Sequence, residues 1–471
     1  MAHCERLSAL DAHFLDLEDA GVHMHVGALL LFDAGPLARP DGSLDFESIR
    51  ALVGSQLHRV PRYRQRLAWI PLEHHPVWVD EPEFNLLYHV RHVSLPRPGD
   101  VRQLKRLTGL LLSQKLDPGK PLWEIWVIEG VEGGRLALVA KAHHCMIDGI
   151  AGVDLLATLL RPTPDPAVQK PPRWRPRPAP GAAELLVGEA WRRAREPVAL
   201  LRAGARALRR PRPALRSLAE STRGIAETLL AGFADPAPPT PLNPAHVGPH
   251  RRFDAIRFDL ARVKEVKRRL GGTLNDVVLA TVAGALRRFL RGRGVSVAHL
   301  ELRALCPVNV RADSEHASLG NRVVMLLVPL PVSERDPRRR LRRVIQATQA
   351  LKHSRQIRGA ELIEEIADWT ATALITETIR LATRRRAFNL IVTNVPGPAT
   401  PLYLLGAPLL ETYPWAPLYE NQALAIALFS HQDGLFWGLN SDWDRVPDLH
   451  DFAGALATEF DELSKLAESS P

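Results

Sequence analysis

Two proline-rich stretches near the middle of the chain set the strongest limit on its fold. RPTPDPAVQKPPRWRPRPAPG begins at Arg161, and ADPAPPTPLNPAHVGPH ends at His250. Proline lacks a backbone N–H and cannot continue a helix or a central strand, so neither stretch can form a regular core element. A chain of 471 residues is also too long for one ordinary core. We therefore predict two domains, residues 1–160 and 253–471, joined by a linker over residues 161–252.

The linker also carries the basic charge of the chain. The whole chain has a net charge of +9, whereas residues 161–252 contain 17 Lys and Arg against 7 Asp and Glu, a net +10. Basic residues concentrated in one segment do not make a binding face for nucleic acid across the fold. Leucines and Trp191 recur at helical spacing beside arginines. The linker is then either a solvated helical connector packed on both domains, or a basic amphipathic surface that rests on anionic lipid.

Composition and the N-terminal sequence predict a cytoplasmic protein. With 46% hydrophobic and 24% charged residues the chain is globular in type, and it has no apolar run of about 18 residues. The first residues, MAHCERLSALDAHFLDLEDAG, carry acids and histidines where a secretory signal needs a basic start and an apolar stretch. Three scattered cysteines form neither a disulfide framework nor a metal-ligand pattern.

Outside the linker, both halves alternate strands with helices, which predicts a mixed α/β fold. The strands expected from period-two and apolar runs are residues 22–33, 123–130, 135–144, 250–260, 302–310, 321–331, 388–397, 422–430 and 435–443. The expected helices are residues 45–60, 99–116, 273–294, 336–356, 361–385 and the C-terminus. The last two strands form a hairpin through HQDG.

The sequence HHCMIDG follows one of these strands and contains the best candidates for chemistry. Because alternate strand residues share a face, His144 ends the apolar face that begins at Leu136, and His143 lies on the more polar side. We therefore expect His144 to point inward and His143 to face away from any substrate channel. Gly149 permits a tight turn, and Asp148 suits the N-cap of the helix that follows.

An inward histidine at the end of a strand allows more than one interpretation. It can be a satisfied core residue. A metal site is disfavoured, because neighbouring strand residues face opposite ways and no HExxH or cysteine cluster completes a ligand set. A serine hydrolase would need a GxSxG elbow, which is absent. The remaining possibility is a neutral imidazole that takes a proton directly from a substrate hydroxyl.

HHCMIDG resembles the HHxxxDG motif of the bacterial wax ester synthase and acyl-CoA:diacylglycerol acyltransferase family, a branch of the CoA-dependent acyltransferases with an HxxxD core. Further stretches resemble other motifs of the family: PLWE at Pro121, TLNDVVLA at Thr273, TNVPGP at Thr393, and also LSALDAHFLDLED, PRYRQRL and WGLNSDWDRVPD. Their order runs through almost the whole chain except the linker.

The resemblance implies two chloramphenicol-acetyltransferase-like domains that enclose a tunnel with the histidine at its middle. Acyl-CoA, as a substrate and not a cofactor, would enter from one side and diacylglycerol or a long-chain alcohol from the other. His144 would act as general base and His143 would support it. Asp148 would hold its loop through an ion pair, next to Gly149 of the motif.

The resemblance also suggests roles in the other motifs. Asn275 would donate to the oxyanion, although Asn275 and Asp276 could equally just begin a helix. Trp123 could contact the acyl chain or belong to the core. The predicted substrate-binding residues are Pro121, Leu122, Trp123 and Asp276.

The favoured function is an O-acyltransferase that makes triacylglycerol or wax ester at the inner face of the membrane or on lipid droplets. One alternative is another HxxxD acyltransferase, such as a condensation-type enzyme that takes acyl groups from a carrier protein. Another is a catalytically idle member of the fold that coats lipid surfaces. The intact HHxxxDG motif and the Asn275–Asp276 pair within TLNDVVLA, here called the ND motif, favour the enzyme.

Overall fold

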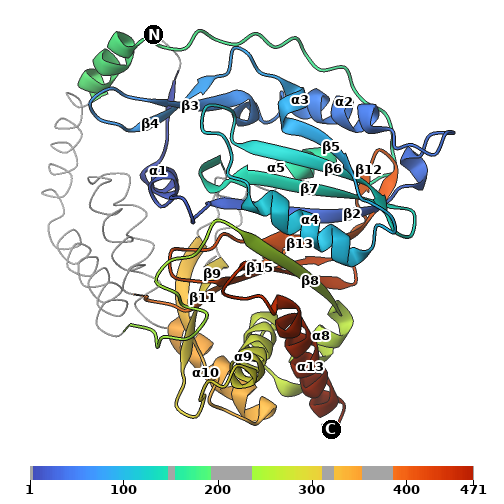
Figure 1. Ribbon diagram of the computed structural model, residues 1–471, viewed down its shortest axis with the longest axis vertical. Coiled ribbons are helices and arrows are strands. Elements are labelled where there is room, and N and C mark those ends of the chain that lie inside the picture. Colours follow the sequence, from blue (N-terminus) through green and yellow to red (C-terminus); the bar gives the residue numbers. More distant parts are fainter. Residues whose placement is uncertain (1–3, 147–153, 193–235, 310–322, 353–385, 470–471) are drawn as a thin grey trace, which may run out of the picture.

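The protein has two α/β domains stacked one above the other (Figure 1). The computed structural model describes residues 4–146, 154–192, 236–309, 323–352 and 386–469. Each domain is built on a six-stranded mixed sheet. The mixed α/β architecture agrees with the alternation of strands and helices in the sequence.

The sheet of the first domain has the strand order β12-β13-β2-β7-β6-β5. Its strands are β2 (His25–Asp33), β5 (Val90–Ser94), β6 (Trp123–Val131), β7 (Arg135–His143), β12 (Tyr403–Leu404) and β13 (Ala407–Trp415). The accompanying helices are α1 (Ala9–Asp16), η1 (Gly35–Leu37), α2 (Phe46–Gln56), η2 (Pro61–Arg64), α3 (Leu86–His89), α4 (Val101–Ser113) and α5 (Asp154–Leu159). Leu30, Leu138 and Val127 of the central strands are at most 2% exposed and pack with Leu52 of α2.

Strands β12 and β13 come from the second half of the chain and pair with the first sheet. β13 runs antiparallel to β2, so that Trp415 lies opposite Gly27. The predicted boundary, which gave residues 253–471 entirely to the second domain, therefore does not hold for residues 403–415. This strand was missed because APLLETYPW contains two prolines and lacks a clear alternation of apolar and polar residues.

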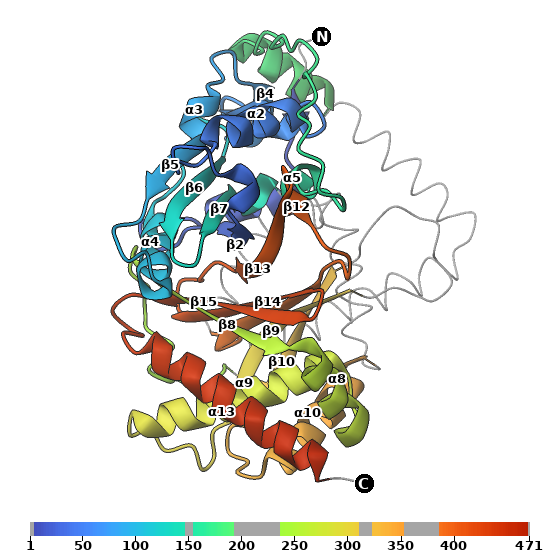
Figure 2. The same cartoon turned by 90° about the vertical axis from the view of Figure 1, so that its right-hand side faces the viewer.

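The sheet of the second domain has the order β10-β9-β11-β14-β15-β8. Its strands are β8 (Arg251–Asp259), β9 (Leu302–Asn309), β10 (Val323–Leu330), β11 (Leu390–Pro396), β14 (Leu424–His431) and β15 (Gly434–Asp442). Its helices are α8 (Leu260–Leu270), α9 (Leu274–Gly292), α10 (Pro337–Lys352) and α13 (Leu449–Glu468). Figure 2 shows these helices on the side of the sheet that faces away from the first domain. The helix predicted over residues 361–385 lies outside the described residues.

The two sheets face each other across a buried seam. Val139 of β7 and Leu31 of β2 share one hydrophobic cluster with Phe253 of β8. Gly438 of β15 lies against the crossing strand, where an added Cβ would stand 1.6 Å from the carbonyl oxygen of Pro414. A side chain at that position would therefore push the sheets apart. Helix α4 also packs against β8 at this seam.

A third, smaller sheet and part of the linker lie at the outer end of the first domain. The sheet consists of β1 (Glu5–Arg6), β4 (Pro76–Asp80) and β3 (Gln65–Trp69) in that order. Arg177 of the linker donates to both carboxylate oxygens of Asp80 at 3.0 and 3.1 Å. Burial raises the pKa of Asp80, but these hydrogen bonds outweigh burial and leave the pKa at about 2.

A helix over residues 182–192 continues this linker segment. Leu185, 8% exposed, packs with Ile70, Val77 and Val79 of the small sheet. The described part of the linker is thus attached to the first domain. Residues 193–235, which include Arg193, Arg202, Arg206, Arg209 and Arg210 of the predicted basic amphipathic stretch, lie outside the described residues. Among the helices that are described, none is both long and apolar enough to cross a membrane.

Candidate active site

Strand β7 ends at His143, and the 3-10 turn η3 (His144–Met146) begins with His144. Strand alternation therefore stops at the first histidine, one residue earlier than the sequence predicted. His143 is 1% exposed, whereas His144 is partly exposed. The expectation that His143 lies on a polar side was wrong, because that face of β7 is covered by the second domain across the seam.

The hydrogen bonds of His143 define its tautomer. Its Nδ1 accepts from the backbone N–H of Cys145 at 3.1 Å, so Nδ1 carries no proton. The proton is then on Nε2, which lies 3.3 Å from Oε1 of Glu18. The His143 backbone N–H donates to the carbonyl of Leu122 at 2.9 Å. The first histidine of the motif is thus a fixed, buried residue that links Glu18 to the turn.

Glu18 is the centre of a buried polar network at the seam. Besides His143, its carboxylate binds Nζ of Lys115 at 3.0 Å and the backbone N–H of Met24 at 2.9 Å. Met24 in turn accepts from the backbone N–H of His144 at 2.7 Å. Burial raises the pKa of Glu18, but the contacts with His143 and Lys115 outweigh burial, so the pKa stays below its usual value. The carboxylate is therefore charged at neutral pH.

Two more histidines surround this network. His25, which is paired with His143 across β2 and β7, places Nε2 3.6 Å from the Glu18 carboxylate. His23 lies next to His25, with ring centroids 5.5 Å apart. Burial and the nearby cation of Arg251 lower the pKa of His23 to about 4. Burial also lowers the pKa of His25, so both imidazoles are neutral at pH 7.

His144 combines a packed ring with a depressed pKa. The ring stacks on Phe14 of α1 with centroids 3.8 Å apart. Its Nδ1 is enclosed and has no hydrogen-bond partner among the described residues. Burial, followed by the neighbouring His143, lowers the pKa of His144 to about 4. A neutral imidazole at pH 7 can accept a proton, and the other buried candidate, Cys145, stays a thiol because burial raises its pKa.

The PLW motif lies in the core directly beside this turn. Trp123 is 1% exposed, its Nε1 donates to the carbonyl of Tyr63 at 2.8 Å, and its ring stacks on His89 at 4.6 Å. Leu122 is 2% exposed, and Pro121 is also buried. Of the two interpretations open for Trp123, the structure favours the core residue. The motif positions the end of β7, because the carbonyl of Leu122 accepts a hydrogen bond from the backbone N–H of His143.

The ND and NVPGP motifs meet in the second domain. Asn275, in the first turn of α9, accepts from Nδ2 of Asn394 on β11 through its Oδ1 at 2.8 Å. This contact directs the oxygen of the Asn275 amide toward Asn394. Its Nδ2 has no hydrogen-bond partner in the part of the chain that the structure describes, so it remains available as a donor.

Asp276 caps the helix and is not placed to contact a substrate. Its Oδ2 accepts from the backbone N–H and hydroxyl of Thr273 at 2.7 and 2.8 Å, and its Oδ1 accepts from Thr348 at 2.7 Å. The side chain is 2% exposed. The predicted substrate-binding role of Asp276 is therefore corrected to a capping role.

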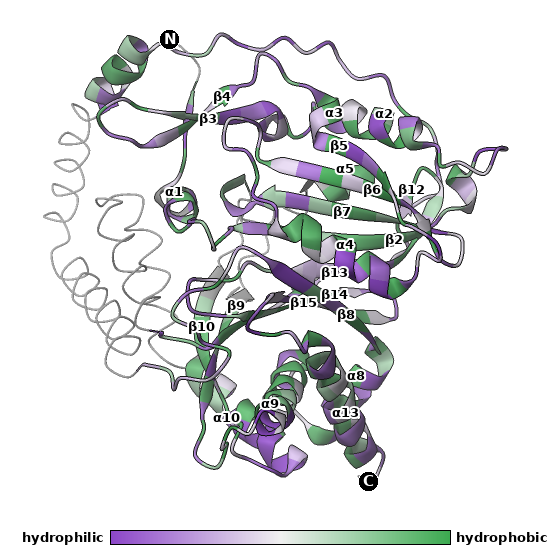
Figure 3. Cartoon of the chain, in the orientation of Figure 1, coloured by the Kyte–Doolittle hydropathy of each residue, from purple (hydrophilic) through white to green (hydrophobic). Residues whose placement is uncertain are grey.

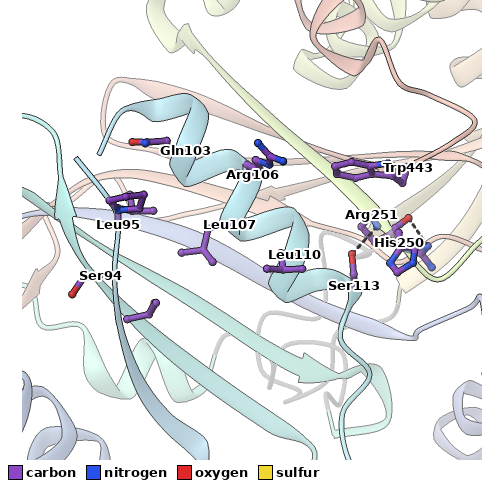
Figure 4. A pocket seen from close by; sticks show the side chains of 12 residues that line it. Ser94, Leu95, Gln103, Arg106, Leu107, Leu110, Ser113, His250, Arg251 and Trp443 are labelled. Carbon is purple, nitrogen blue, oxygen red and sulfur yellow. Dashed lines mark hydrogen bonds between the residues drawn. The ribbon is translucent and has the colours of Figure 1, made fainter. Parts of the chain in front are cut away.

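A cavity of about 610 Å³ opens at the seam between α4 and β8 (Figure 4). Leu107 and Leu110 of α4 form an apolar wall, and Trp443 lies on the opposite side. At one end the backbone N–H of Arg251 donates to Oγ of Ser113 at 2.8 Å. The cavity thus reaches the arginine that borders the histidine network.

Two predicted site residues, Asp148 and Gly149, lie outside the described residues. In the described ranges, no three His, Cys, Asp or Glu side chains are grouped so that they could hold a metal ion. Sequence reasoning missed Glu18, Lys115, His25 and Asn394. The signal for His25 was available, because HMH alternates on a predicted strand that could pair with the strand ending in HH.

Comparisons with known proteins identify the fold and the family. Among solved structures, the first condensation domain of the calcium-dependent antibiotic synthetase has a TM-score of 0.59 at 19% identity, covering 100% of this chain and 97% of that chain. At that identity the likeness concerns the fold alone. The family described as "Wax ester synthase/diacylglycerol acyltransferase catalytic domain" matches residues 7–278, and the "WS/DGAT C-terminal domain" matches residues 319–464.

The chain belongs to the wax ester synthase/diacylglycerol acyltransferase family and is an acyltransferase. A solved wax ester synthase/diacylglycerol acyltransferase from Marinobacter aquaeolei VT8 has a TM-score of 0.68 at 27% identity, covering 98% of this chain and 100% of that chain. A protein of Mycobacterium tuberculosis H37Rv named as a probable diacylglycerol O-acyltransferase is 32% identical over 462 residues, which are 96% of this chain and 93% of the relative.

Proposed function

We propose that the protein moves a long-chain acyl group from acyl-CoA to the hydroxyl of diacylglycerol, of a long-chain alcohol, or of both. The names of the relatives support this choice of acceptors: the Marinobacter protein is named for both activities and the mycobacterial relative for diacylglycerol. Acyl-CoA is a substrate in this scheme, and the reaction needs no cofactor.

His144 is the general base of the proposed reaction. Its enclosed Nδ1 leaves Nε2 to take the proton of the acceptor hydroxyl as the oxygen attacks the thioester carbonyl. The tetrahedral intermediate then expels the CoA thiolate, which receives the proton from the imidazolium. The products are an ester and free CoA, and no bond between acyl group and protein is formed.

Asn275 is the proposed donor to the oxyanion of the tetrahedral intermediate. The support is the orientation of the Asn275 amide. Its Oδ1 accepts a hydrogen bond from Asn394, whereas its Nδ2 donates to no other described residue. A donor that is already oriented stabilises the developing charge without reorganising during the reaction. His143 and Glu18 act through His144 and are positioning residues.

The observation that carries this proposal is the partly exposed, neutral His144 imidazole, whose backbone N–H is fixed by the carbonyl of Met24 and whose ring stacks on Phe14. The test is release of free thiol from palmitoyl-CoA with dioleoylglycerol, hexadecanol or no acceptor, together with identification of the ester by mass. Acceptor-dependent thiol release and a matching ester are the expected results. Ester formation only from a carrier-protein thioester would instead identify a condensation-type enzyme, and no turnover with either donor would identify an idle member of the fold.

The proposed place of work is a lipid surface, the cytoplasmic face of a membrane or a lipid droplet. The net +10 of residues 161–252 supports this, because clustered basic residues are attracted to anionic lipid headgroups. Both proposed acceptors also partition into lipid rather than water, so the protein must meet them at such a surface.

A further inference from the structure

Arg251, the first residue of β8, is a buried cation at the seam between the two domains. The residue is 2% exposed, although arginine is among the residues least often found fully buried. Burial lowers the pKa of Arg251 to about 10, so the guanidinium is still charged at pH 7. Because a buried charge is costly unless it is hydrogen-bonded, the contacts of this side chain indicate what it stabilises.

The guanidinium joins the two domains through backbone carbonyl groups. Its Nη2 donates to the carbonyl of Gly21 in the first domain. Its Nη1 donates to the carbonyls of Gly248 and, at 3.2 Å, His250, which lie just before β8. The backbone N–H of Arg251 also donates to Oγ of Ser113 at 2.8 Å (Figure 4). Because the two nitrogen atoms have separate partners, one side chain spans the seam.

Gly21 belongs to a tight turn of the first domain. The carboxylate of Asp19 accepts from the backbone N–H groups of Gly21 and Val22 at 2.7 Å each. The backbone N–H of Asp19 donates to the carbonyl of Val22 at 3.2 Å. An added Cβ at Gly21 would overlap the carbonyl oxygen of Val247, so the turn lies directly against the segment that leads into β8. The contact with Arg251 therefore fixes the turn as a unit.

This turn separates the two residues that hold the histidine pair. Glu18 precedes the turn, and its carboxylate lies 3.3 Å from Nε2 of His143. Met24 follows the turn, and its carbonyl accepts from the backbone N–H of His144 at 2.7 Å. Glu18 also accepts from the backbone N–H of Met24 at 2.9 Å, which closes a loop over residues 18–24. This loop contacts the second domain on one side and both histidines on the other.

We propose that Arg251 is a positioning residue through which the second domain holds the loop over residues 18–24, and with it the two histidines, in the geometry needed for acyl transfer. The inference rests on the proposed role of His144 as the base. Without the guanidinium, the carbonyl of Gly21 loses its donor and the loop can shift relative to the second domain. A displacement of about 1 Å can cost on the order of 100-fold in rate, so turnover falls while acyl-CoA binding is kept.

A second cation crosses the same seam and provides a matched control. Lys105 of α4 forms an ion pair with Asp254 of β8, and its Nζ also donates to the carbonyl of Ala255 at 2.9 Å. Figure 3 shows hydrophilic residues on β8 where the strand passes α4. Lys105 joins the domains as Arg251 does, but these partners do not belong to the loop over residues 18–24. A loss caused only by weaker domain docking should therefore appear when either cation is replaced.

The test compares Arg251→Met with Lys105→Met in the full chain, by thiol release from palmitoyl-CoA and by hydrogen–deuterium exchange. We expect Arg251→Met to lower kcat with hexadecanol at least tenfold, with less than a threefold change in the Michaelis constant for palmitoyl-CoA. Exchange in the peptides that contain Met24 and His144 should become at least tenfold faster. Lys105→Met should change each quantity less than twofold. Circular dichroism and thermal unfolding verify that both variants fold.

Arg251→Lys takes the place of Arg251→Met if the latter does not fold. It keeps the buried charge, but its single nitrogen cannot hold the carbonyls of Gly21 and Gly248 at two separate positions. We expect kcat to fall at least threefold and exchange to become faster. Unchanged kcat or unchanged exchange in the folded variant would overturn the inference, as would an equal loss of kcat in Lys105→Met.

His144→Ala separates this inference from the proposed function. If Arg251 acts through His144, adding Arg251→Met to His144→Ala should lower the residual rate less than twofold. Fully additive losses would overturn the inference and keep the acyltransferase proposal. No transfer by the wild type to hexadecanol or dioleoylglycerol would remove the proposed substrates, whereas the exchange rates would still decide whether Arg251 holds the loop.

Discussion

The carboxylate of Glu18 lies 3.3 Å from Nε2 of His143 and also receives the backbone N–H of Met24, whose carbonyl accepts from the backbone N–H of His144. The two adjacent histidines are therefore held by the same short segment in different ways. Glu18 fixes the ring of the first histidine and, through Met24, the backbone of the second. In the proposed mechanism this arrangement divides the pair into a held imidazole, His143, and an acting one, His144.

Replacing Glu18 tests whether the fixed His143 ring supports the reaction at His144. Glu18→Gln removes the negative charge between His143 and Lys115 but keeps a hydrogen-bond acceptor. We expect turnover to fall by roughly 10- to 100-fold, which is the effect of about 1.5 to 3 kcal/mol for a lost charged hydrogen bond. The Michaelis constant for acyl-CoA should change less than threefold, since Glu18 acts through the histidines. Steady-state kinetics of thiol release give both values.

A double-mutant cycle with His143→Gln serves as the control for this prediction. If Glu18 acts through His143, the two substitutions together should cost little more than the larger of the two alone. Additive losses would contradict the network and show that the residues act separately.

The two histidines should differ in the kind of loss they produce. His144→Ala is expected to lower turnover by about 10² to 10⁴ with unchanged thermal stability, since it removes the proposed base. His143→Ala should also lower the free energy of unfolding, by about 1 to 3 kcal/mol, because it leaves Glu18 and the N–H of Cys145 without their partner. Near-normal turnover of a folded His144→Ala protein would remove the base from the mechanism.

Sequence patterns predicted the main elements because each strand and helix has its own local signal. β7 and α9 fall where period-two and helical spacing place them. The crossing strand β13 was missed because its pairing with β2 is set by contacts between distant parts of the chain.

The site was predictable only in part, and for the same reason. His144, Asn275, Glu18 and Asn394 all lie in stretches that resemble family motifs, but the motifs do not tell which of these residues pair. Glu18 and Asn394 are brought into place by tertiary structure alone. The face of His143 was assigned wrongly because the second domain buries the face expected to be polar, and β7 ends one residue before the predicted end.

The Asn275–Asn394 pair leads to a prediction about the transition state. Asn275→Ala should lower turnover by about 10² to 10³ and leave acyl-CoA affinity almost unchanged, because an oxyanion donor acts on charge that appears during the reaction. Asn394→Ala should cost less, roughly tenfold, since the amide of Asn275 remains but is no longer oriented. A rise in the Michaelis constant alone, or unfolding of Asn275→Ala, would assign Asn275 to binding or to the start of α9.

The depressed histidine pKa values predict how stability depends on pH. His23 and His144, with pKa values of about 4 in the folded protein, bind protons near pH 6.5 once the chain unfolds. The unfolded state therefore holds more protons between pH 6.5 and 4, and stability falls as the pH is lowered through this range. Each of the two contributes roughly 3 kcal/mol over the whole interval. Urea unfolding at several pH values measures the slope, which should become shallower in His23→Gln.

Activity should tolerate acid better than an ordinary histidine base would allow. A base with its pKa near 6.5 is about 90% protonated at pH 5.5, which would cut the rate roughly tenfold from its value at high pH. Because the pKa of His144 is about 4, the imidazole stays neutral down to pH 5.5. We expect kcat/KM for acyl-CoA with a dissolved alcohol to change less than twofold between pH 7.5 and 5.5, measured at 25 °C where the protein remains folded. A tenfold fall with a midpoint near pH 6.5 in the folded enzyme would contradict this prediction. It would show either that substrate binding raises the pKa of His144 back to its ordinary value or that another histidine is the base. The activity of His144→Ala at both pH values distinguishes these two explanations.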